Sequence, residues 1–357
     1  MTNTIKSIVK KTPLIKLYKF GRKKIEEYQE KKKYTKPIPS SLPNQLFIEI
    51  TDHCMLKCIM CPRRHFKRGI GFMNIDLYKK IIDEVSQWPE PPTIMLVFLG
   101  EPLAHSEFIK FVQYAANKKV VVNTVSNGYV LTPRLSEEIL NSGLERITFS
   151  LDAATKEVYD QIRIKSDWKR VIDNVNYLLN LRQKKNLKKP YIQVSFVIQD
   201  KNEHQVEDFI NIWLPKVDVV YFQRVFDDLR DLTGRQMVER NLFNLTAEKR
   251  IPCYYLWNSM VVYWNGEVAT CPPDDFGKNI MGDANKENLA DIWKNELYQR
   301  LRNLHLNGQY GDEKFTFCKN CDYWRGYRLN KKTHLTINGI KVLKEENPLF
   351  ISYNPIR

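Results

Sequence analysis

The stretch Cys54-Met-Leu-Lys-Cys58-Ile-Met-Cys61 places three thiols in a short segment directly after the run Leu46-Phe-Ile-Glu-Ile50. The run is rich in β-branched and aromatic residues and predicts a strand, so the cysteines lie in the loop that follows it. Thiolate is the soft ligand that zinc and iron–sulfur clusters prefer, and three thiolates leave one iron of a cubane cluster without a protein ligand. The alternative from spacing alone is a zinc site with His65 as the fourth ligand.

This Cys-x3-Cys-x2-Cys loop, followed by Pro62-Arg63, resembles the signature of the radical S-adenosylmethionine (radical SAM) enzymes. In that family the open iron is chelated by the amino and carboxylate groups of S-adenosylmethionine. The resemblance implies that the reduced cluster cleaves this cofactor to a 5'-deoxyadenosyl radical, which removes a hydrogen atom from substrate. Met55 and Met60 stand where Asn and an aromatic residue are frequent, but neither position carries a bond to the cluster.

From Leu46 onward, strand and helix patterns alternate, which is typical of a parallel sheet. The predicted strands are Leu46–Ile50, Thr93–Leu99, Val120–Val125, Arg146–Leu151, Tyr191–Ile198 and Val217–Gln223. The predicted helices between them are Asn74–Gln87, Ser106–Lys118, Thr132–Ser142, Asp167–Lys184 and Glu203–Trp213. The resemblance implies an α/β fold, a partial (β/α)6 TIM-like barrel over residues 46–235, with chemistry at the carboxyl ends of its strands.

Three motifs at these carboxyl ends resemble the family's cofactor-binding segments. Gly100-Glu101-Pro102 follows the second strand; glycine permits close approach of the backbone to a ligand, and a carboxylate can accept hydrogen bonds from an ammonium group. The resemblance implies that this segment holds the methionyl amine, with Leu99 in place of the family's first glycine. Ser126-Asn127, after the third strand, stand where the family holds the ribose and carboxylate, and Ser150 is a further candidate contact to the carboxylate.

Two charged residues are candidates for the substrate side of the site. Asp152 follows Ser150 in a segment similar to the family's Ser-x-Asp and is expected either to point towards substrate or to cap a helix. Arg224, at the end of the sixth strand, is either a surface cation or a group in the cavity that binds a substrate oxygen.

The chain has seven cysteines, an odd number that argues against a full disulfide framework. Those outside the first loop are Cys253, Cys271, Cys318 and Cys321, and their spacing alone also allows a structural zinc. Between the first two, Trp264–Val268 predicts a hairpin, and Leu289–His305 predicts a helix. The segment Gly282–Trp293 resembles the SPASM extension, and the four cysteines match its shortened twitch form. The resemblance implies an auxiliary [4Fe-4S] cluster within residues 250–330, and therefore two [4Fe-4S] clusters in the chain.

Residues 1–45 form a basic extension. Residues 1–40 carry twelve Lys or Arg and three Glu, and 12 − 3 gives +9 of the chain's net charge of +15. The pattern after Pro13 predicts an amphipathic helix, and Pro37, Pro39 and Pro43 indicate a linker. The helix either packs on the main domain or binds an anionic membrane surface through residues 1–36. Nucleic acid is not expected, because aromatic residues are not interleaved with the basic ones.

The chain of 357 residues contains no run of about 20 apolar residues that would span a membrane. An apolar signal segment is also missing at the N-terminus. We therefore expect a cytoplasmic protein with reduced thiols, peripheral at the membrane if the basic helix binds there. Residues 331–357 form a C-terminal tail for which no chemistry is predicted.

The cysteine count favours net oxidation. An auxiliary cluster with four protein ligands suits electron transfer, and no thiol remains to return a hydrogen atom to a substrate radical, as epimerases of this family often do. The resemblance to twitch-type alcohol dehydrogenases implies oxidation of a sugar, cyclitol or similar alcohol to a ketone, with flavodoxin or ferredoxin as external reductant. The alternatives are a peptide maturase, an epimerase and a non-catalytic iron–sulfur scaffold. Residues 1–45 are too short and too basic for the peptide-binding domain that many maturases carry.

Overall fold

The computed structural model describes residues 41–65, 69–224, 250–274, 277–321, 324, 331–346 and 350–356. The chain divides into two compact units, Met1–Pro39 and Ser40–Arg357, and the described residues all belong to the second. The predicted amphipathic helix and the first two prolines of the linker lie outside the described residues. Among the helices that are described, none is long and apolar enough to cross a membrane.

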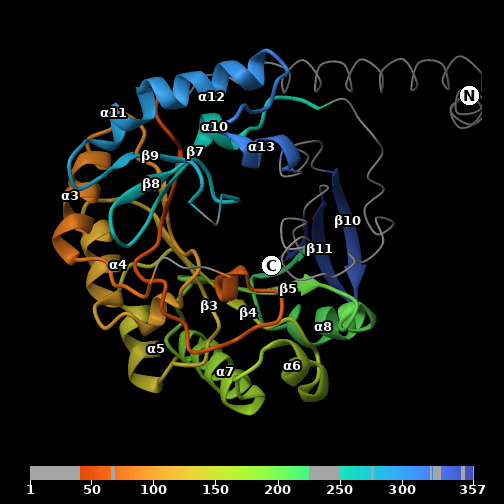
Figure 1. The fold of residues 1–357 in the computed structure, drawn as a ribbon. Helices are drawn as coiled ribbons and strands as arrows, with labels where there is room; N and C mark the ends of the chain where they lie inside the picture. The colour runs from red at the N-terminus through yellow and green to blue at the C-terminus, as the bar shows by residue number, and fades with distance from the viewer. Residues whose placement is uncertain are drawn as a thin grey trace, which may run out of the picture. The chain divides into compact units, whose positions relative to one another are not determined.

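One curved twelve-stranded sheet organises the second unit, in the order β10-β11-β12-β6-β5-β4-β3-β2-β1-β7-β8-β9 (Figure 1). Its middle is a run of parallel strands, which confirms the predicted (β/α) core. These strands are β1 (Gln45–Ile48), β2 (Thr93–Leu96), β3 (Val122–Ser126), β4 (Arg146–Ser150), β5 (Tyr191–Ile198) and β6 (Val219–Arg224).

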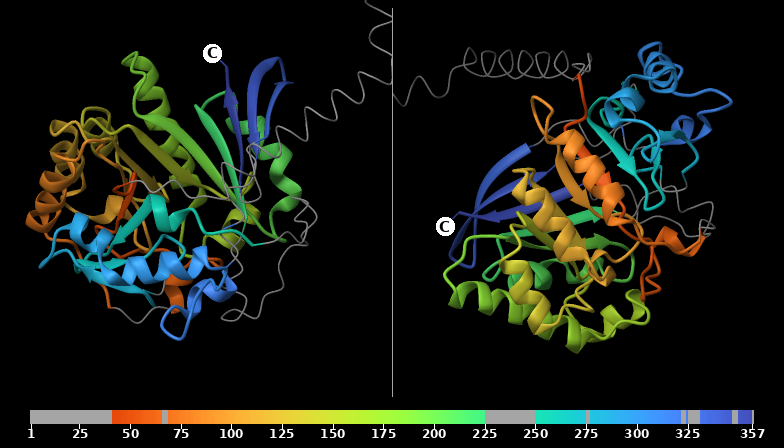
Figure 2. Two further views of the ribbon diagram at one scale, coloured as in Figure 1. Left: turned by 90° about the horizontal axis from the view of Figure 1, so that it is seen from above. Right: turned by 90° about the vertical axis from the view of Figure 1, so that its left-hand side faces the viewer.

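Helices between these strands cover the outer face of the sheet (Figures 1 and 2). They are α3 (Ile75–Val85), α4 (Phe108–Asn117), α5 (Pro133–Leu140), α6 (Lys156–Ile162), α7 (Trp168–Lys184) and α8 (Val206–Trp213), with short 3-10 turns η1 (Pro62–His65), η2 (Pro102–Ala104) and η3 (Glu203–Gln205). The sequence did not predict α6, which is only two turns long and leaves little room for an amphipathic pattern to repeat.

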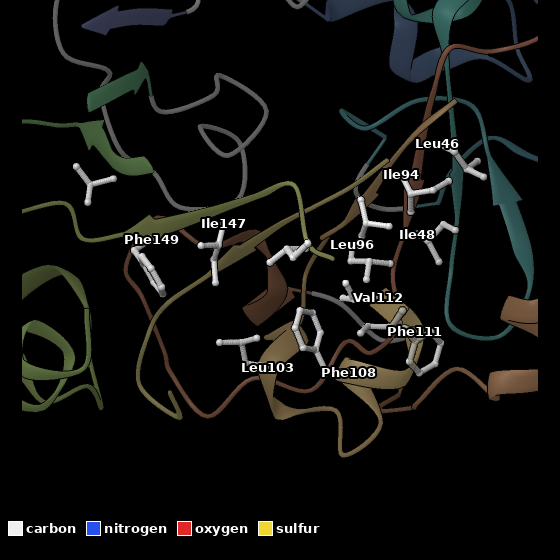
Figure 3. Packing of buried hydrophobic residues seen from close by; sticks show 14 of the residues in the cluster. Leu46, Ile48, Ile94, Leu96, Leu103, Phe108, Phe111, Val112, Ile147 and Phe149 are labelled. Carbon is white, nitrogen blue, oxygen red and sulfur yellow. The ribbon is translucent and has the colours of Figure 1, made fainter. Parts of the chain in front are cut away.

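The core lies between the sheet and these helices. Side chains alternate between the two faces of a strand, so every second residue of each strand faces the helices. Leu46 and Ile48 of β1 pack with Ile94 and Leu96 of β2 and with Phe108 of α4 in one fully buried cluster (Figure 3). Burying each such side chain contributes about 1.5–3 kcal/mol. This apolar face leaves the other face of the strands free to line the site.

Both edges of the parallel core are covered by the C-terminal third of the chain. At one edge β7 (Ser259–Val262) pairs with β1 in parallel, followed by antiparallel β8 (Glu267–Ala269) and β9 (Ile280–Asp283). At the other edge β12 (Phe350–Pro355) pairs with β6, followed by β11 (Ile340–Glu346) and β10 (Lys331–Ile337). The segment expected to be a tail thus extends the sheet and protects its edge.

The predicted hairpin between β7 and β8 is confirmed. Gly266 holds its turn with a φ of +93°, a conformation that favours glycine. The predicted single helix from Leu289 to His305 is instead two helices, α11 (Leu289–Lys294) and α12 (Glu296–Leu306). Asn295 separates them, because its side-chain oxygen accepts a hydrogen bond from Tyr298 N at 3.0 Å and starts α12 afresh. The short helices α10 (Tyr255–Asn258) and α13 (Thr316–Asn320) complete this region.

Candidate cluster and cofactor sites

The first cysteine loop lies at the carboxyl end of β1 and is tied down on two sides. Arg63 Nη2 donates to the carbonyl of Cys54 at 2.8 Å, within the loop itself. Lys57 N donates to the carbonyl of Ile164, just after α6, at 2.8 Å, and Ile59 N donates to that of Ile162, at the end of α6, at 3.0 Å. These contacts hold the loop over the end of the parallel sheet, where the sequence predicted it.

The three thiols of this loop interact electrostatically. Burial raises the pKa of Cys54 and raises that of Cys61 to about 11, and the neighbouring Cys58 raises both further. Three cysteine sulfurs in one largely buried loop form a soft donor set, and they would bind a cationic group as thiolates. The donor set therefore fits an iron–sulfur cluster. Among the described residues, no three His, Cys, Asp or Glu side chains converge closely enough to hold a single metal ion, and the side chain of His65 lies outside the described residues.

The Gly100-Glu101-Pro102 motif packs directly against this loop. A Cβ atom on Gly100 would lie 2.0 Å from the carbonyl oxygen of Thr51, so only glycine permits the approach. Glu101 N donates to the carbonyl of His53 at 2.8 Å, and Pro102 begins η2. The second motif thus lies beside the residues that lead into the first.

The Glu101 carboxylate is buried and joins two strand ends. It accepts hydrogen bonds from Ser126 Oγ at 2.7 Å, from Asn127 N at 2.7 Å and from Leu103 N at 3.1 Å. Burial raises its pKa, which these donors partly offset. A carboxylate has about four acceptor sites, so one is left for a further donor such as an ammonium group.

Two other predicted cofactor contacts differ in their surroundings. Asn127 Nδ2 donates to Cys54 Sγ at 3.7 Å, so the structure brings the third strand end to the cysteine loop. Ser150, at the end of β4, is linked to Ser195 of β5 through their hydroxyls at 3.4 Å. The motifs after β1, β2 and β3 are therefore in mutual contact, and Ser150 lies one strand further along the sheet.

Asp152 is fully buried, with its carboxylate turned into the protein. One oxygen accepts a hydrogen bond from Val197 N at 2.7 Å, and the other pairs with Arg163. Arg163 Nη1 also donates to Cys58 Sγ at 3.6 Å. Burial lowers the pKa of Arg163, but Asp152 and Cys58 raise it well above its ordinary value, so the guanidinium stays charged. The structure thus places Asp152 in an ion pair with an arginine that contacts the cysteine loop, and Thr155, not Asp152, occupies the N-cap position of α6.

Arg224 ends β6, and its side chain lies outside the described residues. The sequence missed a different set of polar side chains. They lie on the face of the parallel strands opposite the apolar core and are Glu49, Asn123, Thr148, Gln193 and Ser195. Each is at most 9% exposed. Polar residues recurring at every second position of predicted buried strands were the signal that could have identified them.

The four remaining cysteines line one small cavity in the C-terminal region, together with Leu256, Pro273, Phe317, Trp324, Arg250 and His305. Cys253 lies just before α10, Cys271 just after β8, Cys318 within α13 and Cys321 directly after it. Burial raises the pKa of Cys253 to about 11, that of Cys318 to about 12 and that of Cys271 well above its ordinary value. Four desolvated thiols around an otherwise largely apolar cavity fit a fully ligated iron–sulfur cluster.

Arg250 and His305 flank these thiols and were not singled out in the sequence. Arg250 donates to the carbonyls of Cys318 and, at 2.7 Å, Lys319, which braces the last cysteine pair. Burial lowers the pKa of His305 to about 3, so its imidazole is neutral at ordinary pH. Neither residue belongs to a local sequence motif, so only the folded structure shows that both line the cavity.

Comparison with known proteins gives two family matches. A model described as the Radical SAM superfamily matches residues 48–212, and SPASM, an iron–sulfur cluster-binding domain, matches residues 253–322. The tungsten-containing aldehyde ferredoxin oxidoreductase cofactor-modifying protein of Pyrococcus furiosus is 25% identical over 305 residues, 74% of this chain and 85% of that protein.

Two further proteins are similar to this chain. The S-adenosyl-L-methionine-dependent 2-deoxy-scyllo-inosamine dehydrogenase of Niallia circulans is 23% identical over 286 residues, 77% of this chain and 91% of that protein. The structure of Streptococcus suis SuiB bound to precursor peptide SuiA superposes with a TM-score of 0.58 and 16% identity, over 77% of this chain and 70% of that one. The latter likeness supports the fold alone.

Proposed function

Because this chain belongs to the radical SAM superfamily and carries a C-terminal SPASM iron–sulfur domain, we propose that it dehydrogenates a small polyhydroxy alcohol such as a sugar or cyclitol. It is an enzyme that uses S-adenosylmethionine and [4Fe-4S] clusters. When bound, the cofactor and the first cluster supply a 5'-deoxyadenosyl radical, and the auxiliary cluster supplies a one-electron acceptor. The remaining steps depend on how the chain holds its substrate.

We assign the holding roles from the contacts described above. In this proposal Cys54, Cys58 and Cys61 ligate the first cluster, and Glu101 uses its free acceptor site for the methionyl amine. Asn127 orients Cys54 and contacts the cofactor, while Ser150 reaches its carboxylate. The proposed core of residues 46–235 and auxiliary domain of residues 250–330 enclose the two matched ranges.

The single observation that carries the oxidation proposal is the placement of all seven cysteines. Three lie in the loop after β1, and four line one cavity in the C-terminal region. None of these cysteines is therefore left to donate a hydrogen atom. A substrate carbon radical would instead be converted to product by losing a proton and an electron. The similar protein of Niallia circulans is named as a dehydrogenase, which favours the same chemistry for this chain.

A continuous chain of contacts supports electron transfer towards the second cavity. The rings of Phe98, which follows β2, and Tyr263 lie 5.3 Å apart. Tyr263 Oη donates to the carbonyl of Asp274 at 2.9 Å, and Asp274 N donates to the carbonyl of Cys271 at 3.0 Å. These packed groups run from the carboxyl end of the barrel strands to a ligand of the auxiliary centre.

The side chains on the inner face of the barrel support the proposal that the substrate is polar. Asn123, Thr148 and Gln193 supply hydroxyl and amide groups suited to alcohol oxygens. Glu49, 1% exposed, is the carboxylate on the same face, and its Oε1 accepts from Leu99 N at 3.4 Å. We propose that Glu49 accepts the proton of the substrate hydroxyl, which would leave a ketone two hydrogens lighter than the alcohol.

The test begins with cyclitols and nucleotide sugars, screened under anaerobic conditions for those that stimulate cleavage of S-adenosylmethionine. The active compound is then converted in deuterated water and the product mass recorded. We expect a product two mass units lighter with no deuterium at carbon. A product of unchanged composition with one carbon-bound deuterium would show epimerisation, and stimulation only by a peptide would favour a maturase.

Replacing the proposed base separates proton transfer from radical formation. Glu49→Gln should lower substrate turnover by about 10²–10⁴-fold, the usual contribution of a general base. Its iron content should match that of wild type. Cys58→Ala is the control that removes cofactor cleavage altogether. Turnover by Glu49→Gln at the wild-type rate would exclude Glu49 as the base.

The supply of electrons and the location of the enzyme belong to the same proposal. Flavodoxin or ferredoxin would reduce the first cluster in the cytoplasm. Residues 1–36, which contribute +9 of the chain's net charge of +15, would bring the enzyme to an anionic membrane surface. A chain lacking residues 1–36 should lose salt-sensitive binding to anionic vesicles while still cleaving the cofactor. Full-length protein that ignores such vesicles at low salt would contradict this role.

A further inference from the structure

His305 on α12 has one ring nitrogen whose role is determined by the backbone. Cys253 N donates to His305 Nδ1 at 3.3 Å, so Nδ1 acts as the acceptor. In a neutral imidazole the other nitrogen then carries the hydrogen. His305 is therefore a donor through Nε2, on a side chain only 1% exposed.

This donor is buried without a hydrogen-bond partner in the described part of the chain. Leaving such a group unsatisfied costs about 1–3 kcal/mol. His305 lines the cavity of the four cysteines, whose other walls include the apolar side chains of Leu256, Pro273 and Phe317. A buried donor in such a cavity indicates an acceptor that the thiols would hold there.

Arg250 has the same incomplete bonding. Its Nη1 and Nη2 groups donate to the carbonyls of Lys319 and Cys318, and its guanidinium lies over the ring of Tyr310 at 4.4 Å from the ring centre. Its Nε is buried and has no hydrogen-bond partner among the described residues. These contacts fix a positive charge and a second donor at the edge of the same cavity.

We propose that His305 Nε2–H donates a hydrogen bond to a sulfur of the auxiliary cluster and, with Arg250 beside it, raises the reduction potential of that cluster. Reduction adds negative charge to the sulfurs, so a donor aimed at them stabilises the reduced form more than the oxidised form. The inference rests on the auxiliary cluster and is independent of which substrate is oxidised. It would make the auxiliary cluster a better electron acceptor.

The experiment measures the potential without any substrate. In the full-length chain, Cys54, Cys58 and Cys61 are all replaced by Ala, so that only the auxiliary cluster remains. The potential is read by redox titration with electron paramagnetic resonance detection, on samples of equal iron content. We expect His305→Leu to make reduction about tenfold less favourable, which for one electron is about 59 mV.

Two variants make this result specific. His305→Gln keeps an acceptor for Cys253 N and an N–H donor, and should recover part of the shift. His105→Leu removes another buried histidine, whose ring nitrogens contact Met73 O and Glu107 N in the barrel, and should leave the potential unchanged. An unchanged potential in His305→Leu would overturn the proposal, and so would an equal shift in His105→Leu.

If His305→Leu does not assemble the cluster, a measurement on protein with native His305 decides the question. The reduced auxiliary cluster is studied by pulsed electron paramagnetic resonance in protein labelled with ¹⁵N-histidine. We expect a weak nitrogen coupling, as from a hydrogen-bonded ring. Absence of any coupling would refute the donor role, and a strong coupling from a directly bound nitrogen would show a ligand instead. Neither result depends on the oxidation proposed above, which product analysis tests separately.

Discussion

Arg163 connects the first cysteine loop to the interior of the barrel. Its guanidinium pairs with Asp152, and both side chains are at least nine-tenths buried. The same guanidinium donates to Cys58 Sγ at 3.6 Å. Asp152 is held in turn by Val197 N, so a single ion pair joins β5, the segment after β4 and the cluster loop. We infer that Asp152 and Arg163 position the loop and do not contact substrate.

Removing the cation should leave Asp152 as an uncompensated buried charge. Arg163→Met is expected to lower the free energy of unfolding by about 3–5 kcal/mol. The double variant Asp152→Asn with Arg163→Met should recover part of that loss, because no charge is then stranded. Denaturant unfolding of the apoprotein under anaerobic conditions measures both.

A surface ion pair supplies the matched control for this prediction. Arg134 pairs with Glu138 on α5 with its side chain 89% exposed, and Arg134→Met should leave stability unchanged. If Arg163→Met were as stable as this control, the pair with Asp152 would have no structural importance.

Among the elements, α11 and α12 start by different means. The amides of Leu289 and Ala290, at the start of α11, donate to the Glu84 carboxylate of α3 at 2.9 Å each. A residue in the barrel thus caps a helix of the C-terminal region. At the start of α12, Asn295 provides the cap itself and also donates to the carbonyl of Met281 in β9 at 2.7 Å.

This difference predicts unequal effects of the same substitution at two asparagines. Asn295→Ala should lower the free energy of unfolding by about 1 kcal/mol, the usual cost of losing an N-cap. Asn288→Ala, at the N-cap position of α11, should have a smaller effect, since its side chain makes no capping hydrogen bond. The denaturant midpoints of the two variants decide the matter, and equal losses would contradict the role of Glu84 as the cap of α11.

Within the whole second unit, both edges of the parallel core are closed by segments far away in sequence. β7 covers β1, and β12 covers β6, where the rings of Tyr221 and Phe350 lie 5.3 Å apart. An open strand edge with unpaired amides and carbonyls is a template for association with other chains. The C-terminal strands therefore complete the sheet on which the candidate site is built.

A chain ending after residue 330 lacks β10, β11 and β12 and should expose the edge of β6. We expect this truncated protein to self-associate at concentrations where the full chain does not, as measured by light scattering. A chain lacking only Arg357 keeps β12 and is the control. Equal scattering from all three proteins would show that β6 needs no cover.

The sequence by itself determined the features that depend on neighbouring residues. Short cysteine spacings, Gly100-Glu101-Pro102 after a strand, and the alternation of strand and helix are local patterns, and they predicted the parallel core and both cysteine sets. The alternation of side chains within the predicted strands also indicated the polar residues on the inner face of the sheet, although no prediction was made from it. These patterns are readable because strand and helix periods act over a few adjacent positions.

Tertiary structure alone decided which distant groups meet. Arg163 and Asp152 are separated by a turn and a helix, and only the packed loop shows that they pair behind Cys58. His305 reaches the four-cysteine cavity from a helix whose break at Asn295 the helical pattern did not show. The C-terminal strands carried no chemical motif, yet they complete the sheet at β6. In each case burial and hydrogen-bond satisfaction in the folded chain select the partner, and no local sequence pattern encodes that choice.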